Sequence, residues 1–329
     1  EDIAFNKKET IKETIKELVG YDIQEYINLD IEKPEFILEK LIKERTINFL
    51  FGAKGRGKTE FAMGIMNALT HGAEFLHYKA PYCYPVCYLD GEMDPYDIVE
   101  RQNAYIKTWS NPPKNYLHVI NFAHQIDQHI PDIKDELGQG LILKYLRKQE
   151  KLVGKKPLLI LDNLRSLSNY KENDADSWRP IGVFLKDLRG LGFASLVLDH
   201  TGKVDPGPRG TSSKTDWANV CLKIESEGKK GLKVMKVKLS FDKARGLRPE
   251  DTEEFVAQYD FEGRWILGKS NKAEDNENLK MHIRQLLKKN PKPTQKEMSA
   301  LLNIAVGKVN KLMKEMEENK DSNEKTTPY

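Results

Sequence analysis

The chain has 329 residues, of which 39% are hydrophobic and 31% are charged, and its formal net charge at pH 7 is +3. It is longer than a typical domain of about 100–200 residues, so we expect one large core and a smaller appendage. The composition excludes a largely disordered chain, and the small net charge means that nucleic-acid binding would need local basic clusters.

A membrane or secreted location is not expected. No apolar run reaches the roughly 18 residues that a membrane-spanning helix needs, and the start of the chain is charged where a secretory signal would be apolar. The three cysteines are too few and too scattered for a disulfide framework. We therefore expect a cytoplasmic protein, in the host cytoplasm if it is phage-encoded. Because residue 1 is Glu and not Met, we also expect either a piece of a longer polypeptide or a processed form.

Helix-like and strand-like patterns alternate along most of the chain. Apolar residues at helical spacing in 7–19 predict an amphipathic helix within an N-terminal docking segment, residues 1–34. Buried strands are predicted at 45–52, 85–90, 157–162 and 193–199, and helices follow the first strand and lie near 94–108, 138–150 and 177–190. This alternation is typical of a mostly parallel sheet flanked by helices, so residues 35–267 are predicted to form an α/β core. Added strands, expected to be antiparallel, are predicted at 219–225, 232–241 and 254–260.

The C-terminal part has a different character. A polar stretch at 268–278 predicts a linker, and residues 279–329 are predicted to form a small all-α domain with a frayed tail. Its helical patterns lie at 277–289, 294–302 and 306–319. Thr294 and Glu297 form a capping-box pattern at the start of the second helix. We interpret the domain as a helix-turn-helix of the winged type, although no clear wing follows.

The third of these helices has two predicted faces. The residues expected to face inward are Val306, Val309, Leu312, Met313 and Met316. Those expected to face outward are Lys308, Lys311 and Lys314. Such a basic face suits a DNA backbone, but it is also compatible with a solvated surface or a protein contact.

A phosphate-binding motif lies between the first buried strand and the following helix. Its residues are Gly52, Ala53, Lys54, Gly55, Arg56, Gly57, Lys58 and Thr59, which match the pattern G-x-x-x-x-G-K-[ST]. Glycines let backbone N–H groups converge on phosphate oxygens, and the helix N-terminus adds its positive dipole end. The motif predicts that ATP is bound, with Lys58 between the β- and γ-phosphates and the Thr59 hydroxyl on Mg²⁺. A glycine-rich turn without a ligand is the alternative.

Two carboxylates at strand ends complete the predicted chemistry. Asp162 ends the run LLILD, and we predict that it helps Thr59 to hold Mg²⁺. Glu92 follows the strand at 85–90, so it would face the γ-phosphate at the same sheet edge and act as the general base. The alternatives are helix caps formed by Asp162, Asp90 or Glu92.

Taken in order, GAKGRGKT, YLDGEMD, LLILDN, LVLDHTGK and RGTSSKTDWA resemble the RepA-type branch of the RecA-like hexameric helicases, of the superfamily 4 type. The resemblance covers roughly residues 35–265 and implies a RecA-like core. It implies that Glu92 is the catalytic glutamate and that His200 is the sensor linking the γ-phosphate to a DNA-binding loop. It also implies that Lys243 and Arg245 reach the site of a neighbouring subunit, where a guanidinium would stabilise the transferred phosphoryl group. Ordinary surface charge is the alternative for this pair.

The chain also resembles the C-terminal helicase-like part of phage or plasmid primase-polymerases. This likeness implies that a primase or polymerase domain belongs to the same polypeptide. The predicted DNA contacts are Lys203, Arg209 and Lys214 in a loop after the His200 strand, which could instead be a solvated loop, together with Lys308 and Lys311.

The predicted function is that of a ring-forming, ATP-dependent helicase, hexameric by resemblance, which moves on single-stranded DNA in replication. Two alternatives remain. One is a DNA-binding assembly factor in which ATP binding closes a ring or filament and hydrolysis is incidental. The other is a recombination or annealing protein of the same fold that does not unwind duplexes.

Overall fold

The computed structural model describes residues 18–125, 130, 132–170, 175–200, 213–227, 234–268 and 279–324, the last range without 282, 285, 288–292 and 303. The chain divides into two compact units, Glu1–Leu267 and Gly268–Tyr329. The helix expected at 7–19 and the linker expected at 268–278 lie almost wholly outside the described residues. Within the described part, no helix has both the length and the apolar character needed to cross a membrane.

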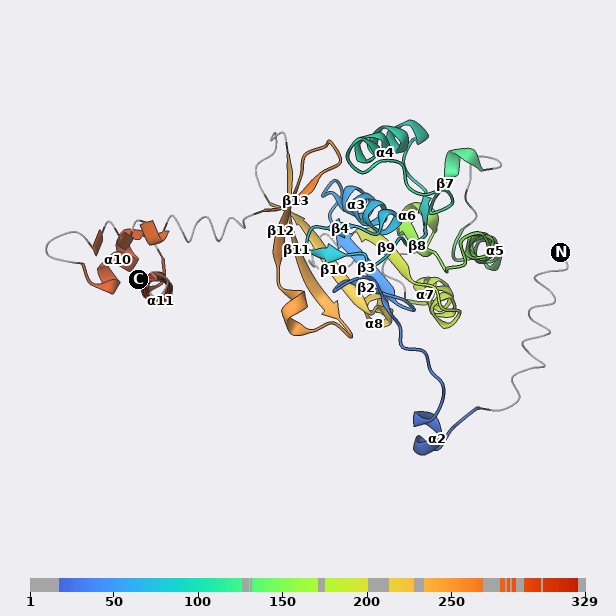
Figure 1. The fold of residues 1–329 in the computed structure, drawn as a ribbon, viewed down its shortest axis with the longest axis horizontal. Coiled ribbons are helices and arrows are strands. Elements are labelled where there is room, and N and C mark those ends of the chain that lie inside the picture. The colour runs from blue at the N-terminus through green and yellow to red at the C-terminus, as the bar shows by residue number, and fades with distance from the viewer. Residues whose placement is uncertain are drawn as a thin grey trace. The chain divides into compact units, whose positions relative to one another are not determined.

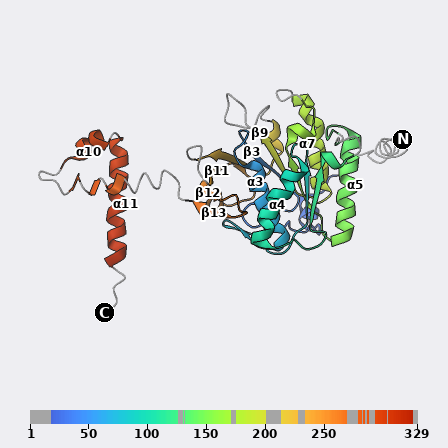
Figure 2. The same cartoon turned by 90° about the horizontal axis from the view of Figure 1, so that it is seen from above.

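A nine-stranded sheet, counted over the described residues, forms the centre of the first unit (Figures 1 and 2). The strand order is β13-β12-β11-β10-β3-β9-β8-β6-β7. Their bounds are β3 Ile47–Gly52, β6 Val86–Asp90, β7 Leu117–Asn121, β8 Leu158–Asp162, β9 Ser195–His200, β10 Val220–Ser226, β11 Met235–Ala244, β12 Phe255–Tyr259 and β13 Trp265–Gly268. Two small hairpins lie outside this sheet: β1 Phe36–Leu38 with β2 Ile42–Lys43, and β4 Glu74–Phe75 with β5 Tyr78–Lys79.

Every neighbouring pair of strands from β10 to β7 runs parallel. β11 runs antiparallel to β10, and β12 runs antiparallel to β11. The predicted mostly parallel sheet is therefore confirmed. The expectation that all the added strands are antiparallel is wrong for β10, because β10 adds to the parallel edge of β3.

Helices cover both faces of the sheet (Figure 1). Their bounds in the first unit are α2 Ile23–Ile27, α3 Lys58–His71, α4 Pro95–Trp109, α5 Glu136–Val153, α6 Leu164–Leu167, α7 Ala175–Gly190 and α8 Ser213–Trp217, with 3₁₀ turns at Phe122–His124 and Pro249–Thr252. Side chains along β3 point alternately to the two faces of the sheet. Leu50 therefore packs in one buried cluster with residues of α3 and α4, and Phe49 and Phe51 pack in another with residues of α5, α6 and α7. This burial on both faces explains the near-continuous apolar strands.

The second unit contains the predicted helix-turn-helix, with α10 at Gln295–Leu302 and α11 at Val306–Glu324. The capping box is present, because the backbone N–H of Thr294 donates to Glu297 Oε2 at 2.7 Å and that of Glu297 donates to Thr294 Oγ1 at 3.3 Å. Val309 and Leu312 are buried, and Met313 and Met316 pack against the same cluster.

The faces of α11 follow the prediction with one exception. Lys308, Lys311 and Lys314 are exposed. Val306 is 40% exposed, so its predicted inward position is wrong. The reason is its place as the first residue of the helix, before the turn that packs against α10.

Candidate active site

Four neighbouring strands bring their polar ends together at one edge of the sheet. Gly52 of β3 pairs in register with His200 of β9, and Asp90 of β6 pairs with Asp162 of β8. Since β9 and β8 are also neighbours, the order β3-β9-β8-β6 places all four ends side by side. Ligands of open α/β sheets bind outside the carboxyl ends of the strands, so this edge is the candidate active site.

The loop after β3 has the backbone that phosphate binding requires. Gly55 and Gly57 adopt φ values of +70° and +85°, which favour glycine. A Cβ on Gly57 would also lie 2.6 Å from the Cε atom of Met235, so the end of that side chain would have to move. Lys58 begins α3 directly after this turn, and the N–H groups of the first helical turn therefore point into the loop.

The buried ammonium of Lys58 connects the loop to the end of β9. It donates to the carbonyl oxygens of Gly52 at 2.9 Å and Ala53 at 3.2 Å, and it lies 3.1 Å from Nδ1 of His200. The side chain is 6% exposed, so these contacts compensate for its removal from water. Lys58 and His200, which the sequence analysis gave separate roles at the phosphates, are thus in direct contact.

Asp162 is buried beside the loop and its environment fits a divalent cation. The Tyr88 hydroxyl donates to Asp162 Oδ2 at 2.7 Å, and the Thr59 side chain is hydrogen-bonded to the same carboxylate. Burial raises the pKa of Asp162, while the bonds from Tyr88 and Thr59 and the charge of Lys58 oppose that rise. A carboxylate and a hydroxyl already in contact are the oxygen donors that Mg²⁺ takes beside a phosphate.

Glu92 lies at the open side of this site. Asn163, the residue after Asp162, donates its side-chain amide to Glu92 Oε2, and Lys54 Nζ lies 3.6 Å from Oε1. The Glu92 side chain is 49% exposed, so it can reach a water molecule. Asp90 is buried instead and accepts from the N–H of Met93 at 3.0 Å.

The two acidic residues therefore differ in role. Burial, reinforced by the charge of Asp162, raises the pKa of Asp90 to about 6. Asp90 also accepts from the side-chain amide of Asn121 at 2.7 Å, so it holds the turn together. The alternative that Asp90 or Glu92 caps the next helix is wrong, because the N-cap of α4 is Asp94, whose side chain accepts from the backbone N–H of Tyr96 at 2.8 Å. Asp90 stabilises the turn before that helix, and Glu92 is the more exposed carboxylate.

Lys243 and Arg245, at the end of β11 and just beyond it, have different surroundings. Lys243 Nζ donates to the carbonyl oxygens of Thr215 and of Asp216, the latter at 3.1 Å, and so closes the end of α8. Lys243 therefore has partners within its own chain, and its contact with a neighbouring subunit stays a prediction. Arg245 is exposed just beyond β11, and its backbone N–H donates to Asn219 at 2.8 Å.

The predicted DNA-binding loop is only partly described. Lys203 and Arg209 lie outside the described residues. Lys214 is 1% exposed and forms an ion pair with Asp199 at 2.7 Å. This burial contradicts the predicted DNA contact of Lys214, because its ammonium has no open path to a phosphate. Lys308 and Lys311 are both exposed on α11.

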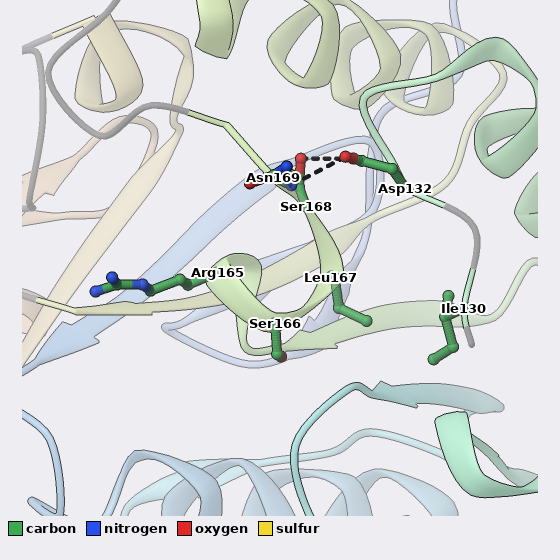
Figure 3. A pocket seen from close by; sticks show the side chains of 7 residues that line it. All are labelled: Ile130, Asp132, Arg165, Ser166, Leu167, Ser168 and Asn169. Atoms are coloured by element: carbon green, nitrogen blue, oxygen red, sulfur yellow. Dashed lines mark hydrogen bonds between the residues drawn. The ribbon is translucent and has the colours of Figure 1, made fainter. Parts of the chain in front are cut away.

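A cavity of about 170 Å³ lies beside α6, near the end of β8 (Figure 3). Asp132 accepts from the Ser168 hydroxyl at 2.7 Å and from the backbone N–H of Asn169 at 2.9 Å. Burial alone would raise the pKa of Asp132, but these bonds and the neighbouring Lys134 lower it below the ordinary value. Asp132 therefore fixes the chain that leaves α6.

Sequence reasoning missed several contacts of this site. Asn163 and Tyr88 carry no motif signal of their own, although Asn163 follows a predicted metal ligand. The buried partners Asp199, Lys214 and Tyr170 are far apart in the sequence, and only the fold brings them together.

Comparison with known proteins adds to these observations. Residues 279–319 match the family model described as winged helix-turn-helix DNA-binding. Among solved structures, the chain is similar to a KaiC-like protein from the hyperthermophilic archaeon Pyrococcus horikoshii OT3, with 14% identity, a TM-score of 0.47, and coverage of 71% of this chain and 94% of that chain. No curated protein matches the chain. Residues 17–206, more than half of the chain, match the model of the AAA domain, and the chain therefore belongs to the AAA domain family.

Proposed function

We propose that this chain is a ring-forming ATPase that couples ATP hydrolysis to movement on single-stranded DNA, as the helicase module of a replication protein. The observation that carries the proposal is the 3.1 Å contact between Lys58 Nζ and Nδ1 of His200. It joins the phosphate loop to the strand that leads into residues 201–212, a segment whose sequence contains Lys203 and Arg209. A change at the γ-phosphate can therefore be passed to a segment suited to a DNA backbone.

The residues of the site have separate roles in this proposal. The N–H groups of residues 53–58 and the Lys58 ammonium would hold the phosphates, and Thr59 and Asp162 would hold Mg²⁺. Mg²⁺ supplies positive charge against the oxygens of the transferred phosphoryl group. Glu92, held by Asn163, orients the attacking water and takes its proton.

Ring formation is expected to complete the site through Arg245. Replacing Arg245 by alanine should lower ATP turnover by about 10³-fold while nucleotide binding persists, because a guanidinium from a neighbour stabilises charge only during transfer. The check is steady-state turnover together with nucleotide affinity. The matched control is Arg248→Ala, because Arg248 lies in the same segment after β11 but pairs with Asp251 of its own chain at 3.3 Å.

Mixing variants separates action in trans from action within one chain. An equal mixture of Arg245→Ala and Lys58→Ala should regain turnover, since each Lys58→Ala subunit offers its arginine to an intact site next to it. No recovery in the mixture, or normal turnover of Arg245→Ala alone, would remove the arginine from this role.

The C-terminal unit is expected to bind duplex DNA through α11. Replacing Lys308 and Lys311 by alanine together should reduce the slope of log affinity against log salt by about 2, close to 0.9 per lost phosphate contact. Fluorescence anisotropy over a salt series measures this slope. The exposed pair Lys107 and Lys114 of the first unit gives the same charge change as a control. An unchanged slope for the α11 variant would leave that face without a DNA contact.

The match to a DNA-binding helix-turn-helix also favours a second candidate, an ATP-switched assembly factor without unwinding activity. Strand displacement on a forked duplex distinguishes the two. The motor displaces a strand only while ATP is hydrolysed, whereas the assembly factor binds the fork without displacement. The likeness to primase-polymerases adds the proposal that a primer-synthesis domain shares the polypeptide.

A further inference from the structure

A buried ion pair lies behind the sensor histidine. Lys214 and Asp199 have side chains that are 1% and 2% exposed, and Lys214 Nζ lies 2.7 Å from Asp199 Oδ2. The same ammonium donates to the Tyr170 hydroxyl at 2.7 Å and lies 5.5 Å from the ring of Trp178. Full removal of both charges from water is costly, so this arrangement depends on all of its hydrogen bonds.

The pair is connected directly to the nucleotide loop. Asp199 precedes His200, and its Oδ1 accepts from the backbone N–H of His200 at 2.8 Å. The carboxylate therefore fixes the backbone that carries the imidazole, and that imidazole contacts Lys58. An unbroken series of contacts runs from Lys58 through His200 and Asp199 to Lys214.

The other side of the cluster belongs to a different part of the chain. Tyr170 follows β8 and α6, and the two residues before it are held by Asp132 (Figure 3). Lys214 lies in α8, which follows residues 201–212. A single ammonium thus bonds the chain that leaves β8 to the chain that leaves β9.

We propose that Lys214 is a positioning residue for the nucleotide sensor: by holding Asp199 against Tyr170, it keeps the His200 imidazole in contact with Lys58. This inference rests on the proposed function, in which His200 reads the γ-phosphate. Without the ammonium, the Asp199 carboxylate is buried without a counter-charge, and it must turn toward water or take up a proton. Either change loosens the backbone at His200 while the phosphate loop stays intact.

The test is a double-mutant cycle between Lys214 and His200. Lys214→Met should lower kcat roughly 10- to 100-fold, the range for a misplaced group, and leave KM for MgATP within about twofold. In a His200→Ala background, the same substitution should lower kcat by no more than about twofold relative to His200→Ala alone. Equal losses in both backgrounds, or no loss in the first, overturn the proposal.

A milder variant keeps the test decisive if Lys214→Met fails to fold. Tyr170→Phe keeps the ring and the ion pair and removes only the hydroxyl. It should lower kcat by about two- to fivefold in the unchanged protein and have no effect beside His200→Ala. A loss that persists beside His200→Ala assigns Tyr170 a purely structural role and contradicts the proposal.

A fluorescence measurement separates this inference from the proposed function. Trp178 is 2% exposed, so its emission reports on the nearby ammonium. Adding a non-hydrolysable ATP analogue with Mg²⁺ should shift that emission in the unchanged protein, but not in Trp178→Phe, His200→Ala or Lys214→Met. A shift that persists in Lys214→Met, or no shift in the unchanged protein, overturns the positioning role. If the emission shifts normally but ATP is not hydrolysed, the motor function is contradicted and the positioning role of Lys214 is not.

Discussion

Replacing Lys58 by alanine should reduce ATP turnover by about 100-fold or more, the usual loss when a charge-stabilising donor is removed. Lys58 is the buried cation of the phosphate loop, and its ammonium already lies among the loop carbonyls and His200. Without it, neither the phosphate charge nor the sensor contact is maintained. Steady-state turnover with and without single-stranded DNA measures the effect, and circular dichroism verifies the fold.

Lys54→Ala is the matched control, because it removes the same side chain from the same loop. Lys54 is 83% exposed, and its ion pair with Glu92 is 3.6 Å long. Exposed pairs of this kind contribute about 0–1 kcal/mol, so turnover should stay within about threefold. Equal losses for the two lysines would mean that general loop charge matters, and not the position of Lys58.

Replacing Glu92 by glutamine should leave nucleotide binding unchanged and lower turnover by about 10²- to 10⁴-fold, the usual contribution of a general base. Glutamine has the same shape and can still accept the hydrogen bond that Asn163 donates to Glu92. It cannot take a proton from water. Single-turnover hydrolysis, measured beside nucleotide affinity, separates the chemical step from binding.

Glu100→Gln on α4 removes the same charge from an exposed position eight residues away, and it should leave ATP turnover unchanged. Turnover of Glu92→Gln above about a tenth of the starting rate is incompatible with a general base at this position. If Glu92→Gln abolishes turnover but leaves biological activity intact, the assembly-factor candidate is favoured, since it needs only ATP binding.

The sequence was sufficient for the central fold because its main signals are local. Apolar strands that end in Gly52, Asp162 and His200, separated by amphipathic helices, specify a parallel sheet with its site at the carboxyl edge. The phosphate loop is equally local, since its positive φ values demand glycine at fixed spacing. The parallel pairing of β10 was not accessible, because strand direction in the added part depends on which edge the chain reaches.

The contacts that two lysines of the site make could not be predicted, for one physical reason. Lys214 and Lys243 are lysines in a polar sequence, and nothing near them signals that each is held within its own chain. Lys214 is buried by Asp199 and Tyr170, and Lys243 is bonded by the carbonyl oxygens at the end of α8. These partners are not neighbours in the sequence, so the charge of the loop suggested a DNA contact for Lys214, and the family resemblance suggested a subunit contact for Lys243. The exposed α11 lysines were predictable because helical spacing fixes their face.

The most direct test of the central claim is a calorimetric titration of the full chain with a non-hydrolysable ATP analogue, in Mg²⁺ and again in EDTA. The account predicts saturable uptake in Mg²⁺ that weakens by roughly tenfold or more in EDTA, because Thr59 and Asp162 bind the nucleotide through the cation. Asp162→Asn should lose this dependence on Mg²⁺. The absence of uptake, or uptake equal in Mg²⁺ and EDTA, would contradict a nucleotide site built from Lys58, Thr59 and Asp162.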